Sequence, residues 1–494
     1  MKIIDKFIKI VIIAGTVACA IVFGTPALSH IVEHHQYEQA SNPMLNKASN
    51  TVLAFHYRNA INSSPDADSP LAPANSKRLR WKNKPFGSIV RKNVVDLTPQ
   101  EKQAFVQAVW TLKNTIPNGS PTNIYDQFVA VHVGAMGLMY DDAQGPAAGH
   151  DGAHESAILL PWHRELVYRF EKALQSVNPN VTIPYWDWTD PKALSVMFSD
   201  DFLGPNGQGV TLNIPVIEGG SDMSIGDGQG ANFNLPGSGN QGGSDMLLGD
   251  GQGANPNIQT VSVQGGPVQS GSFSTASGWT VNPDLHFKSS SKETFGNQIL
   301  RFLQLPPTNS YPVPKEDIEQ VLAIDKYETF RPALEGFIKV DSSTGQQTPG
   351  VYLHNYFHSL VGGGTFDPAV GRPEALGTMT DLATSINDPV FWLVHSNVDR
   401  LWAEWQAKGH EGSDYYPAVG GHYGENLNDR MWPWDGGEST PTNWGPGDSL
   451  SLLPVFSPDD IVTPRDTLNF RKYRYTYDTL TFGVRKPIWK RNSH

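Results

Sequence analysis

Cysteine is almost absent from this 494-residue chain, which contains one cysteine beside fifteen histidines. Because Cys19 stands alone, disulfide scaffolds, zinc fingers, iron–sulfur clusters and thiolate copper sites are excluded. Any bound metal must be held by histidine or carboxylate side chains. Basic residues are also in the minority, since 37 Lys and Arg against 49 Asp and Glu give a formal net charge of −12. This acidity argues against a nucleic-acid partner, which would require a concentrated basic face.

Long apolar runs are equally scarce, and the one that stands out occupies residues 10–24, after three lysines. Small residues at positions 27–29 then offer a cleavage site. The sequence therefore predicts a signal peptide over residues 1–29 and an exported protein, secreted or periplasmic. Because a bilayer span needs about 20 apolar residues, the shorter run favours cleavage. The alternative is a membrane anchor through residues 10–28, and membrane contact is expected only in that case.

The rest of the chain divides by composition. Residues 30–79 are polar and turn-rich and are interpreted as a linker, residues 80–485 as one folded domain, and residues 486–494 as a C-terminal tail. With 47 Gly and 37 Pro in the chain, long irregular connections are expected.

The most Gly-rich part of the domain, at about 205–275, is interpreted as an insertion. One segment occurs twice within it, at residues 220–232 and 243–255. We interpret the insertion as a duplicated surface loop, and its Asp-Gly pairs leave calcium-binding turns as the alternative.

Four predicted helices each carry histidine on an apolar face. They cover residues 123–134, a stretch from Pro161, residues 350–361 and a stretch with Asp388 as N-cap. The inward-facing histidines of these helices are His132, His163, His354, His358 and His395. A sixth, His154, lies nine residues before His163. Because Pro161 interrupts the chain between them, His154 is expected to reach inward from the loop before the helix.

Six buried imidazoles without partners would be costly, whereas metal ligation satisfies one nitrogen of each. Ligation by imidazole alone suits copper or zinc, and six ligands divide naturally as three and three. This division predicts two metal ions. Facing helices of a bundle build sites of this kind. The expected fold is therefore mainly α: a four-helix bundle holding a dinuclear metal site, wrapped by long irregular loops and a few short strands.

Several stretches resemble the tyrosinase family. Its first copper-binding half is similar to Tyr125-Asp-Gln-Phe-Val-Ala-Val-His132, His154-Glu-Ser-Ala-Ile-Leu-Leu-Pro-Trp-His163 and Ile183-Pro-Tyr-Trp-Asp-Trp188. Its second half is similar to Leu353-His354-Asn-Tyr-Phe-His358 and Asp388-Pro-Val-Phe-Trp-Leu-Val-His395-Ser-Asn-Val-Asp-Arg400. The resemblance implies two copper ions in a type-3 centre, with O₂ as co-substrate. It places His132, His154 and His163 on the first copper, and His354, His358 and His395 on the second.

Three details go beyond this pattern. Many family members have paired histidines where this chain has Val394-His395, and the ligand aligns with His395. Asp399, one turn later, either hydrogen-bonds a ligand imidazole or belongs to a structural network with Arg400. His150, close to the expected ligand on the same loop, is interpreted as an ordinary loop residue.

The resemblance implies a phenol oxidase that uses O₂ to convert monophenols and o-diphenols to o-quinones, with a small phenolic compound as substrate. Two alternatives stay open. One is an oxidase confined to o-diphenols or o-aminophenols, and the other is an O₂-binding protein of the haemocyanin kind. The sequence indicates no oligomeric state.

Hydroxylation of a monophenol needs a base near the second metal, because the phenol must lose its proton. In the family, a Glu in a Leu-Glu-Gly turn and an Asn after the first histidine of the second site are thought to hold a water for this. Leu334-Glu335-Gly336 and His354-Asn355 match both positions, so Glu335 and Asn355 are the candidate catalytic residues. The inserted residues 341–349 put the placement of Glu335 in doubt. The alternative makes Glu335 a helix-end salt-bridge residue and Asn355 a surface residue.

Overall fold

The computed structural model describes residues 89–139, 143–216, 259–285, 297–303, 311–367, 372–441 and 449–480. The predicted signal peptide, the linker, both copies of the repeat and the C-terminal tail lie outside these ranges, so those assignments stay predictions. Among the described residues, no helix combines the length and the apolar character that crossing a bilayer requires.

Helices make up most of the described regular structure, as predicted. The α-helices are α2 (Pro99–Asn114), α3 (Ile124–Gly137), α4 (Leu159–Val177), α5 (Ala193–Met197), α7 (Lys315–Leu322), α8 (Tyr327–Glu335), α9 (Leu353–Gly362), α10 (Val390–Ala407) and α11 (Pro464–Thr467). Short 3-10 turns are η2 (Val94–Asp96), η3 (Thr275–Ser277), η4 (Ser385–Asn387), η5 (Ser413–Tyr415), η6 (Ser449–Leu452) and η7 (Phe470–Tyr473).

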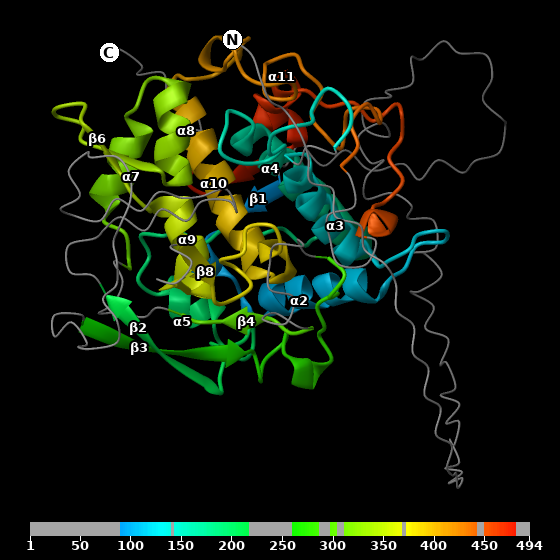
Figure 1. Cartoon of the computed structure of the whole chain (residues 1–494), viewed down its shortest axis with the longest axis vertical. Coiled ribbons are helices and arrows are strands. Elements are labelled where there is room, and N and C mark those ends of the chain that lie inside the picture. Colours follow the sequence, from blue (N-terminus) through cyan, green and yellow to red (C-terminus); the bar gives the residue numbers. More distant parts are fainter. Residues whose placement is uncertain are drawn as a thin grey trace, which may run out of the picture. The chain divides into compact units, whose positions relative to one another are not determined.

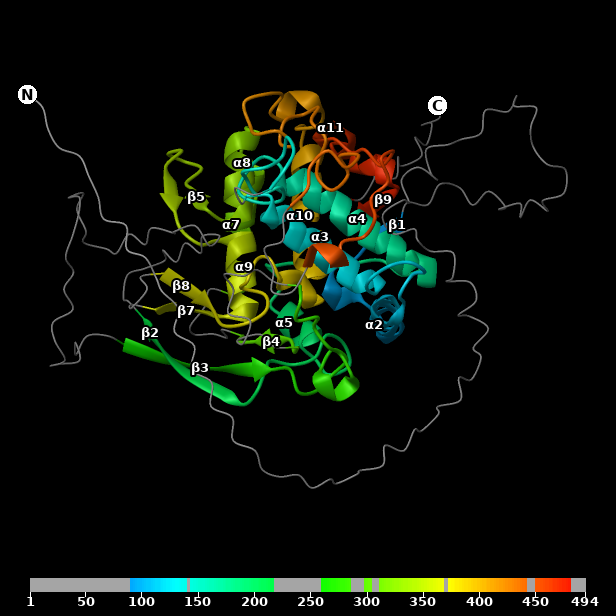
Figure 2. The ribbon, with the colours of Figure 1, turned by 45° about the vertical axis from the view of Figure 1, so that its right-hand side comes forward.

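The helices α3, α4, α9 and α10 are the four that were predicted to carry histidine. In both views α3, α4 and α10 lie together at the centre, with α8 and α9 along one side of α10 (Figures 1 and 2). Helix α10 contacts α4 and α9, and α2 packs against α3 and α4. Between α4 and α10, the rings of Phe170 and Trp392 stack with centroids 3.6 Å apart and planes 2° apart. Aromatic packing of this kind fixes the spacing of the central helices.

Helix α2 begins at a capping motif. Thr98 is its N-cap and Pro99 its first residue, and the Thr98 and Glu101 side chains form a reciprocal capping box. Helix α10 differs by one residue, because it begins at Val390 with Pro389 rather than Asp388 in the N-cap position. The Asp388 carboxylate still accepts the Val390 N–H, at 3.1 Å. That carboxylate also accepts two hydrogen bonds from the buried Arg301, which hold the start of α10 in place.

Helix α9 begins at Leu353, and the prediction of a start near Gly350 was wrong. The backbone before the helix is bound to the end of α8 instead. The Tyr352 N–H donates to the Gly336 carbonyl at 2.9 Å, and the Gly350 N–H donates to the Phe337 carbonyl at 3.0 Å. Glycine is required at position 336, where φ is 104° and a Cβ atom would lie 1.9 Å from the Tyr352 carbonyl oxygen. This close crossing sets the start of α9 against the end of α8.

Strands are few and short. Strand β1 (Ile89–Arg91) pairs in parallel with β9 (Tyr475–Tyr477). The other pairs are antiparallel and comprise β2 (Val210–Val216), β3 (Gln259–Pro267) and β4 (Leu300–Arg301) in that order, β5 (Ile338–Val340) with β6 (Gln347–Pro349), and β7 (Gly364–Asp367) with β8 (Arg372–Ala375). Long irregular connections join these elements, which is the wrapping that the glycine and proline content predicts.

The Gly-rich insertion begins and ends in a paired ribbon. Val210 lies opposite Gly265 and Val216 lies opposite Gln259. In both views, β2 and β3 lie below the helical bundle (Figures 1 and 2). Both copies of the repeat fall between these strands in the sequence, outside the described residues, so their interpretation as a surface loop stays a prediction.

Candidate metal centre

The structure brings the six predicted histidines together as two groups of three. Within each group, one ring nitrogen per residue lies within 4.8 Å of the others. The first triad is His132, His154 and His163, and the second triad is His354, His358 and His395. All six are buried, with no more than 3% of their surface exposed.

Four helices and one loop supply these rings. His132 lies on α3, His163 on α4, and His395 on α10, whereas His354 and His358 lie one turn apart on α9. Residues four apart share one face of a helix, so both α9 rings point the same way. His154 lies in the loop between α3 and α4, as the sequence predicts.

Hydrogen bonds hold five of the six rings at Nδ1. The acceptors are carbonyl, carboxylate and amide oxygens, which carry no hydrogen to donate. Each of these Nδ1 atoms therefore carries the proton. The lone pair is then on Nε2, the nitrogen that binds a metal. The five bonds run from His132 to the Ala383 carbonyl (3.1 Å), from His154 to Asp151 Oδ2 (3.0 Å), from His163 to the Leu159 carbonyl (2.9 Å), from His354 to Asn355 Oδ1 (3.0 Å) and from His358 to the Met379 carbonyl (2.7 Å).

The remaining nitrogens fit a metal. Nε2 of His132, His163 and His358 is buried in each case and has no hydrogen-bond partner. The Nε2 atoms of His354 and His395 lie only 3.3 Å apart. Buried lone pairs without a donor are costly, and a cation held among them removes that cost. A donor set of imidazoles without thiolate suits copper.

Burial keeps most of the rings in the neutral form that binds metal. Burial lowers the pKa of His132 and the pKa of His358 to about 3. It also holds the pKa values of the other three helix-borne rings well below their ordinary value. His154 is the exception. Burial lowers its pKa, but the nearby Asp151 carboxylate outweighs burial, and the pKa of His154 is raised.

The two triads are in direct contact. The rings of His163 and His395, one from each triad, stack with centroids 4.1 Å apart and planes 9° apart. Phe391, one turn before His395, adds an apolar wall that reaches both triads. Its ring centroid lies 5.1 Å from that of His132 and 6.2 Å from that of His358. The two triads therefore meet where α4 and α10 pack together.

Sequence reasoning missed the groups that hold the rings. The carbonyls of Met379 and Ala383 come from one loop between β8 and η4, and each serves a different triad. Backbone carbonyls leave no mark in a sequence. The role of Asp151 could have been predicted, because an aspartate three residues before a loop histidine commonly accepts hydrogen bonds from its own loop.

Asp399 does not bond an imidazole. Its carboxylate accepts from Arg164 Nε at 2.5 Å and from Arg91 Nη1 at 3.0 Å. It also accepts the hydroxyls of the two tyrosines of β9, at 2.5 and 2.6 Å. The structural alternative is therefore the right one, but the partners differ from the expected Arg400, which bonds Asn397 instead.

Glu335 lies at the end of α8 and is 1% exposed. Its Oε1 accepts the N–H of Glu155, the residue after His154, at 2.8 Å. Its Oε2 pairs with Arg331 on the same helix. The inserted residues form the exposed β5–β6 hairpin, so they leave Glu335 buried beside the first triad.

Asn355 is not a surface residue, since only 8% of it is exposed. Its Oδ1 lies 3.0 Å from Nδ1 of His354, its neighbour on α9. Asn355 thus contacts a ring of the second triad, while Glu335 contacts the loop that carries one ring of the first.

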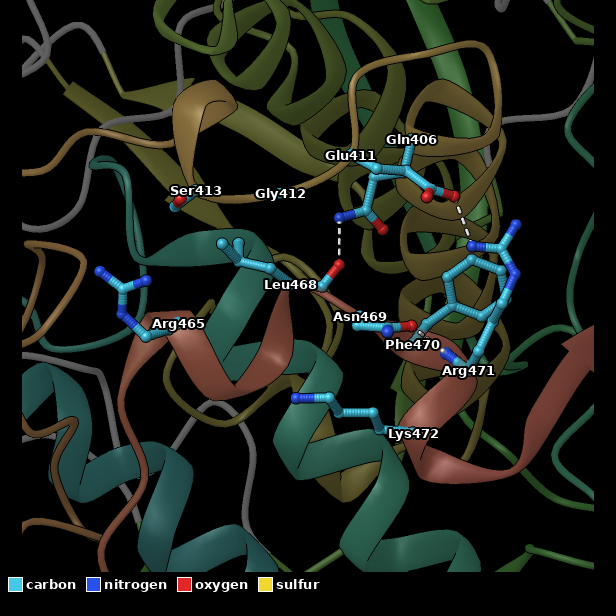
Figure 3. Close-up of a pocket in the computed structure, with 10 residues that line it drawn as sticks. All are labelled: Gln406, Glu411, Gly412, Ser413, Arg465, Leu468, Asn469, Phe470, Arg471 and Lys472. Carbon is cyan, nitrogen blue, oxygen red and sulfur yellow. Dashed lines mark hydrogen bonds and ion pairs between the residues drawn. The ribbon is translucent and has the colours of Figure 1, made fainter.

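His150 is outside both triads, as predicted. Its ring stacks on that of His422 with centroids 4.5 Å apart, and its Nε2 bonds the Tyr423 carbonyl at 3.0 Å. A cavity of about 280 Å³ also lies apart from the triads, because none of the six histidines lines it. Figure 3 shows this cavity beside the end of α10, where Glu411 pairs with Arg471 across its rim.

Known proteins are similar to this chain over the region that contains the two triads. The family model described as the common central domain of tyrosinase matches residues 122–408, which include both triads. A tyrosinase from Streptomyces glaucescens is 31% identical over 357 residues, covering 70% of this chain and 92% of the relative. A grixazone synthase from Streptomyces griseus is 31% identical over 364 residues, covering 70% and 93%.

Among solved structures, a polyphenol oxidase from Thermothelomyces thermophila is similar with a TM-score of 0.43 and 22% identity, covering 75% of this chain and 88% of that chain. The family model matches more than half of the chain, and the two histidine triads fit the dinuclear copper centre that this family uses. The chain therefore belongs to the tyrosinase family of copper oxidoreductases.

Proposed function

We propose that this protein is a phenol oxidase that uses O₂ to oxidise o-diphenols to o-quinones and that also hydroxylates monophenols. The observation that carries the proposal is the contact between two buried histidine triads through His163 and His395. When bound, two copper ions would supply the electrons that reduce O₂, and the two histidine triads would hold one ion each. Six imidazoles, five of them held by a hydrogen bond at Nδ1, would hold such a pair with little rearrangement.

The chain's own groups make this space suitable for the reaction. Burial lowers the pKa of His132 and the pKa of His358 to about 3, so above that pH both rings are neutral and their Nε2 lone pairs are available to a metal. Phe391 contributes an apolar wall next to both triads. An apolar wall excludes water and favours an aromatic ring over a polar competitor.

Monophenol hydroxylation is supported by the placement of Glu335 and Asn355. An ionised carboxylate offers about four acceptor positions, and Glu335 uses one on each oxygen for Glu155 and Arg331. We infer that the remaining positions of Glu335 and the amide N–H₂ of Asn355 bind a water. A water held by these groups would accept the proton of an approaching phenol.

The alternative is an oxidase confined to o-diphenols or o-aminophenols. Relatives of similar identity carry two different names, tyrosinase and grixazone synthase, so identity at this level does not define the substrate. The test therefore has to include all three substrate classes.

The test measures O₂ uptake by copper-reconstituted protein with catechol, with a monophenol plus a trace of catechol, and with an o-aminophenol. Turnover of catechol and of the monophenol supports the proposal. A protein that turns over catechol while remaining inert to every monophenol has the diphenol activity alone. Reversible O₂ binding without turnover of any substrate would identify an O₂ carrier and overturn the proposal.

We also propose that the protein acts outside the cytoplasm. The support is the apolar run at residues 10–24, with three lysines before it and small residues after it. N-terminal sequencing of the protein from its native cells tests this. A mature chain that begins near residue 30 supports export with cleavage, whereas an intact N-terminus in the cytoplasmic fraction contradicts it.

A further inference from the structure

His154 differs from the other five rings in how its backbone is held. The other five histidines lie on α3, α4, α9 and α10, whose backbones are hydrogen-bonded along the helix. His154 lies in an irregular loop between α3 and α4. A loop is more mobile than a helix, so a ligand on a loop needs separate restraints to stay within reach of its metal.

The first restraint is the carboxylate of Asp151. Its Oδ2 accepts the His154 ring at Nδ1, at 3.0 Å. Its Oδ1 accepts the backbone N–H groups of Ala153, at 2.7 Å, and of His154, at 3.2 Å. One carboxylate, itself only 7% exposed, therefore fixes both the ring and the backbone of the same residue. The other Nδ1 atoms that are hydrogen-bonded in the two triads have uncharged acceptors.

The second restraint is the carboxylate of Glu335, on the other side of His154. Its Oε1 accepts the Glu155 N–H at 2.8 Å, and Arg331 holds its Oε2. Glu155 has a φ of 62°, a left-handed conformation that residues other than glycine adopt only where the surroundings impose it. The hydrogen bond that the Glu155 N–H donates to the Glu335 carboxylate stabilises this conformation directly after His154.

We propose that Asp151 and Glu335 form a carboxylate clamp that positions His154 in the first metal site. Asp151 orients the ring, and Glu335 fixes the backbone one residue beyond it. Both are positioning residues in this role, which for Glu335 is distinct from any part in proton transfer. The inference rests on the copper chemistry proposed above, but its test measures copper binding in the absence of phenol.

The clamp makes a selective prediction. Partners that hold a metal-binding histidine typically change metal affinity about 10- to 100-fold when they are removed. The second triad receives its restraints from Asn355, Met379, the Glu335 backbone and the helices α9 and α10. A substitution of the Glu335 side chain leaves its backbone contact in place. Loss of the clamp should therefore weaken copper binding at the first site and leave the second site unchanged.

Two backgrounds separate the sites. In the full-length protein, His358→Ala with His395→Ala leaves the first triad, and His132→Ala with His163→Ala leaves the second. Copper affinity is measured in each background by competition with a chelator. We expect Asp151→Ala to lower the affinity about 10- to 100-fold in the first background and to have no effect in the second. Asp151→Asn keeps an uncharged acceptor for the ring, so its loss should be smaller.

Glu335 provides the second arm of the test. Glu335→Ala removes the acceptor of the Glu155 N–H and should weaken copper binding at the first site, whereas Glu335→Gln keeps an acceptor and should largely restore it. A residue with a purely catalytic role would leave copper affinity unchanged in both variants. The matched control is Asp429→Asn, because Asp429 also accepts two backbone N–H groups in a loop, those of Gly424 and Asn426.

Unchanged first-site affinity in Asp151→Ala and in Glu335→Ala would overturn the clamp. An equal loss at both sites would also overturn it, because that result indicates general destabilisation. If Asp151→Ala does not fold, Asp151→Asn carries the same comparison between the two backgrounds. A wild-type protein that binds two coppers but oxidises no phenol would contradict the proposed function. The copper affinities of the variants would still decide whether the clamp exists.

Discussion

His163 on α4 and His395 on α10 belong to different triads, yet their rings stack with centroids 4.1 Å apart and planes 9° apart. Each ring thus helps to define the position of the other. The contact lies where α4 and α10 pack together, so the packing of two helices sets the relation between two metal sites. A substitution of either histidine removes a candidate ligand from one triad and a neighbour from the other.

His163→Ala and His395→Ala are each expected to reduce oxidase activity to no more than a few per cent of wild type. Each removes one of three imidazoles from a triad, while the helices keep their other packing contacts. Activity with catechol and circular dichroism are measured together. His422→Ala is the control, since this exposed histidine lies outside both triads. Substantial activity in either ligand variant would show that the ligand assignment is wrong.

Glu335→Gln and Asn355→Ala are expected to lower monophenol turnover at least about tenfold more than catechol turnover. General base catalysis typically contributes about 10²- to 10⁴-fold, and only the monophenol reaction needs the phenol deprotonated by this base. Rates with a monophenol and with the matching catechol are compared at equal copper loading. Equal losses for both substrates in both variants would contradict a selective role.

Acidification is expected to destabilise the metal-free protein between about pH 6.5 and pH 3. The pKa values of His132 and His358 are lowered to about 3 in the folded protein, so in this window the unfolded chain binds more protons than the folded one. Stability is therefore highest above the ordinary histidine pKa and falls as the pH falls toward 3. The raised pKa of His154 makes this one residue stabilise the folded protein on acidification, but His132 and His358 have the opposite effect and are two. Urea unfolding across this range measures the effect.

Asp399 also loses its stabilising contribution on acidification. Burial raises the pKa of this carboxyl, but Arg164 and Arg91 together with the two tyrosine hydroxyls outweigh burial and hold that pKa below its usual range. His132→Gln isolates the histidine contribution. Removing one such imidazole should flatten the dependence by about 1.4 kcal/mol per pH unit within the window. A variant whose pH dependence matches that of wild type would show that His132 does not contribute as described.

Gly336→Ala is expected to destabilise the protein by about 1–3 kcal/mol or more. The φ of 104° is strained for alanine, and the added Cβ would lie 1.9 Å from the Tyr352 carbonyl oxygen. Gly345→Ala is a matched control, since Gly345 also has a positive φ of 73° but has no atom within 4 Å of its added Cβ. Thermal unfolding should show a larger loss at Gly336. An equal loss of stability in both variants would mean that the close approach to Tyr352 does not contribute to the cost of the Gly336→Ala substitution.

Local patterns predicted the parts of the site that depend on local structure. The helical spacing of apolar residues around His132, His163 and His395 places each ring on a buried face, and the structure agrees. His154 lies in the loop before the helix, as predicted, but Pro161 does not mark the boundary, because α4 begins earlier, at Leu159, and includes Pro161 in its first turn. Proline is tolerated there because the first N–H groups of a helix have no partner within it.

The parts that failed depend on contacts between distant segments. The start of α9 is set by backbone hydrogen bonds to the end of α8. The Asp399 carboxylate accepts a hydrogen bond from Arg91, which lies 308 residues earlier in the chain. Neither contact has a signature within a short window of sequence. The position of the Met379 and Ala383 carbonyls beside the triads is likewise a consequence of the whole fold.

The central claim is that two metal sites act together in one oxidase, and a copper titration tests it most directly. Copper is added in steps to the metal-free protein, and the rate of O₂ uptake with catechol is measured at each step. We expect the rate to rise until two coppers are bound per chain and then to stay constant. A rate that stays at zero, or that reaches its plateau at one copper per chain, would contradict it.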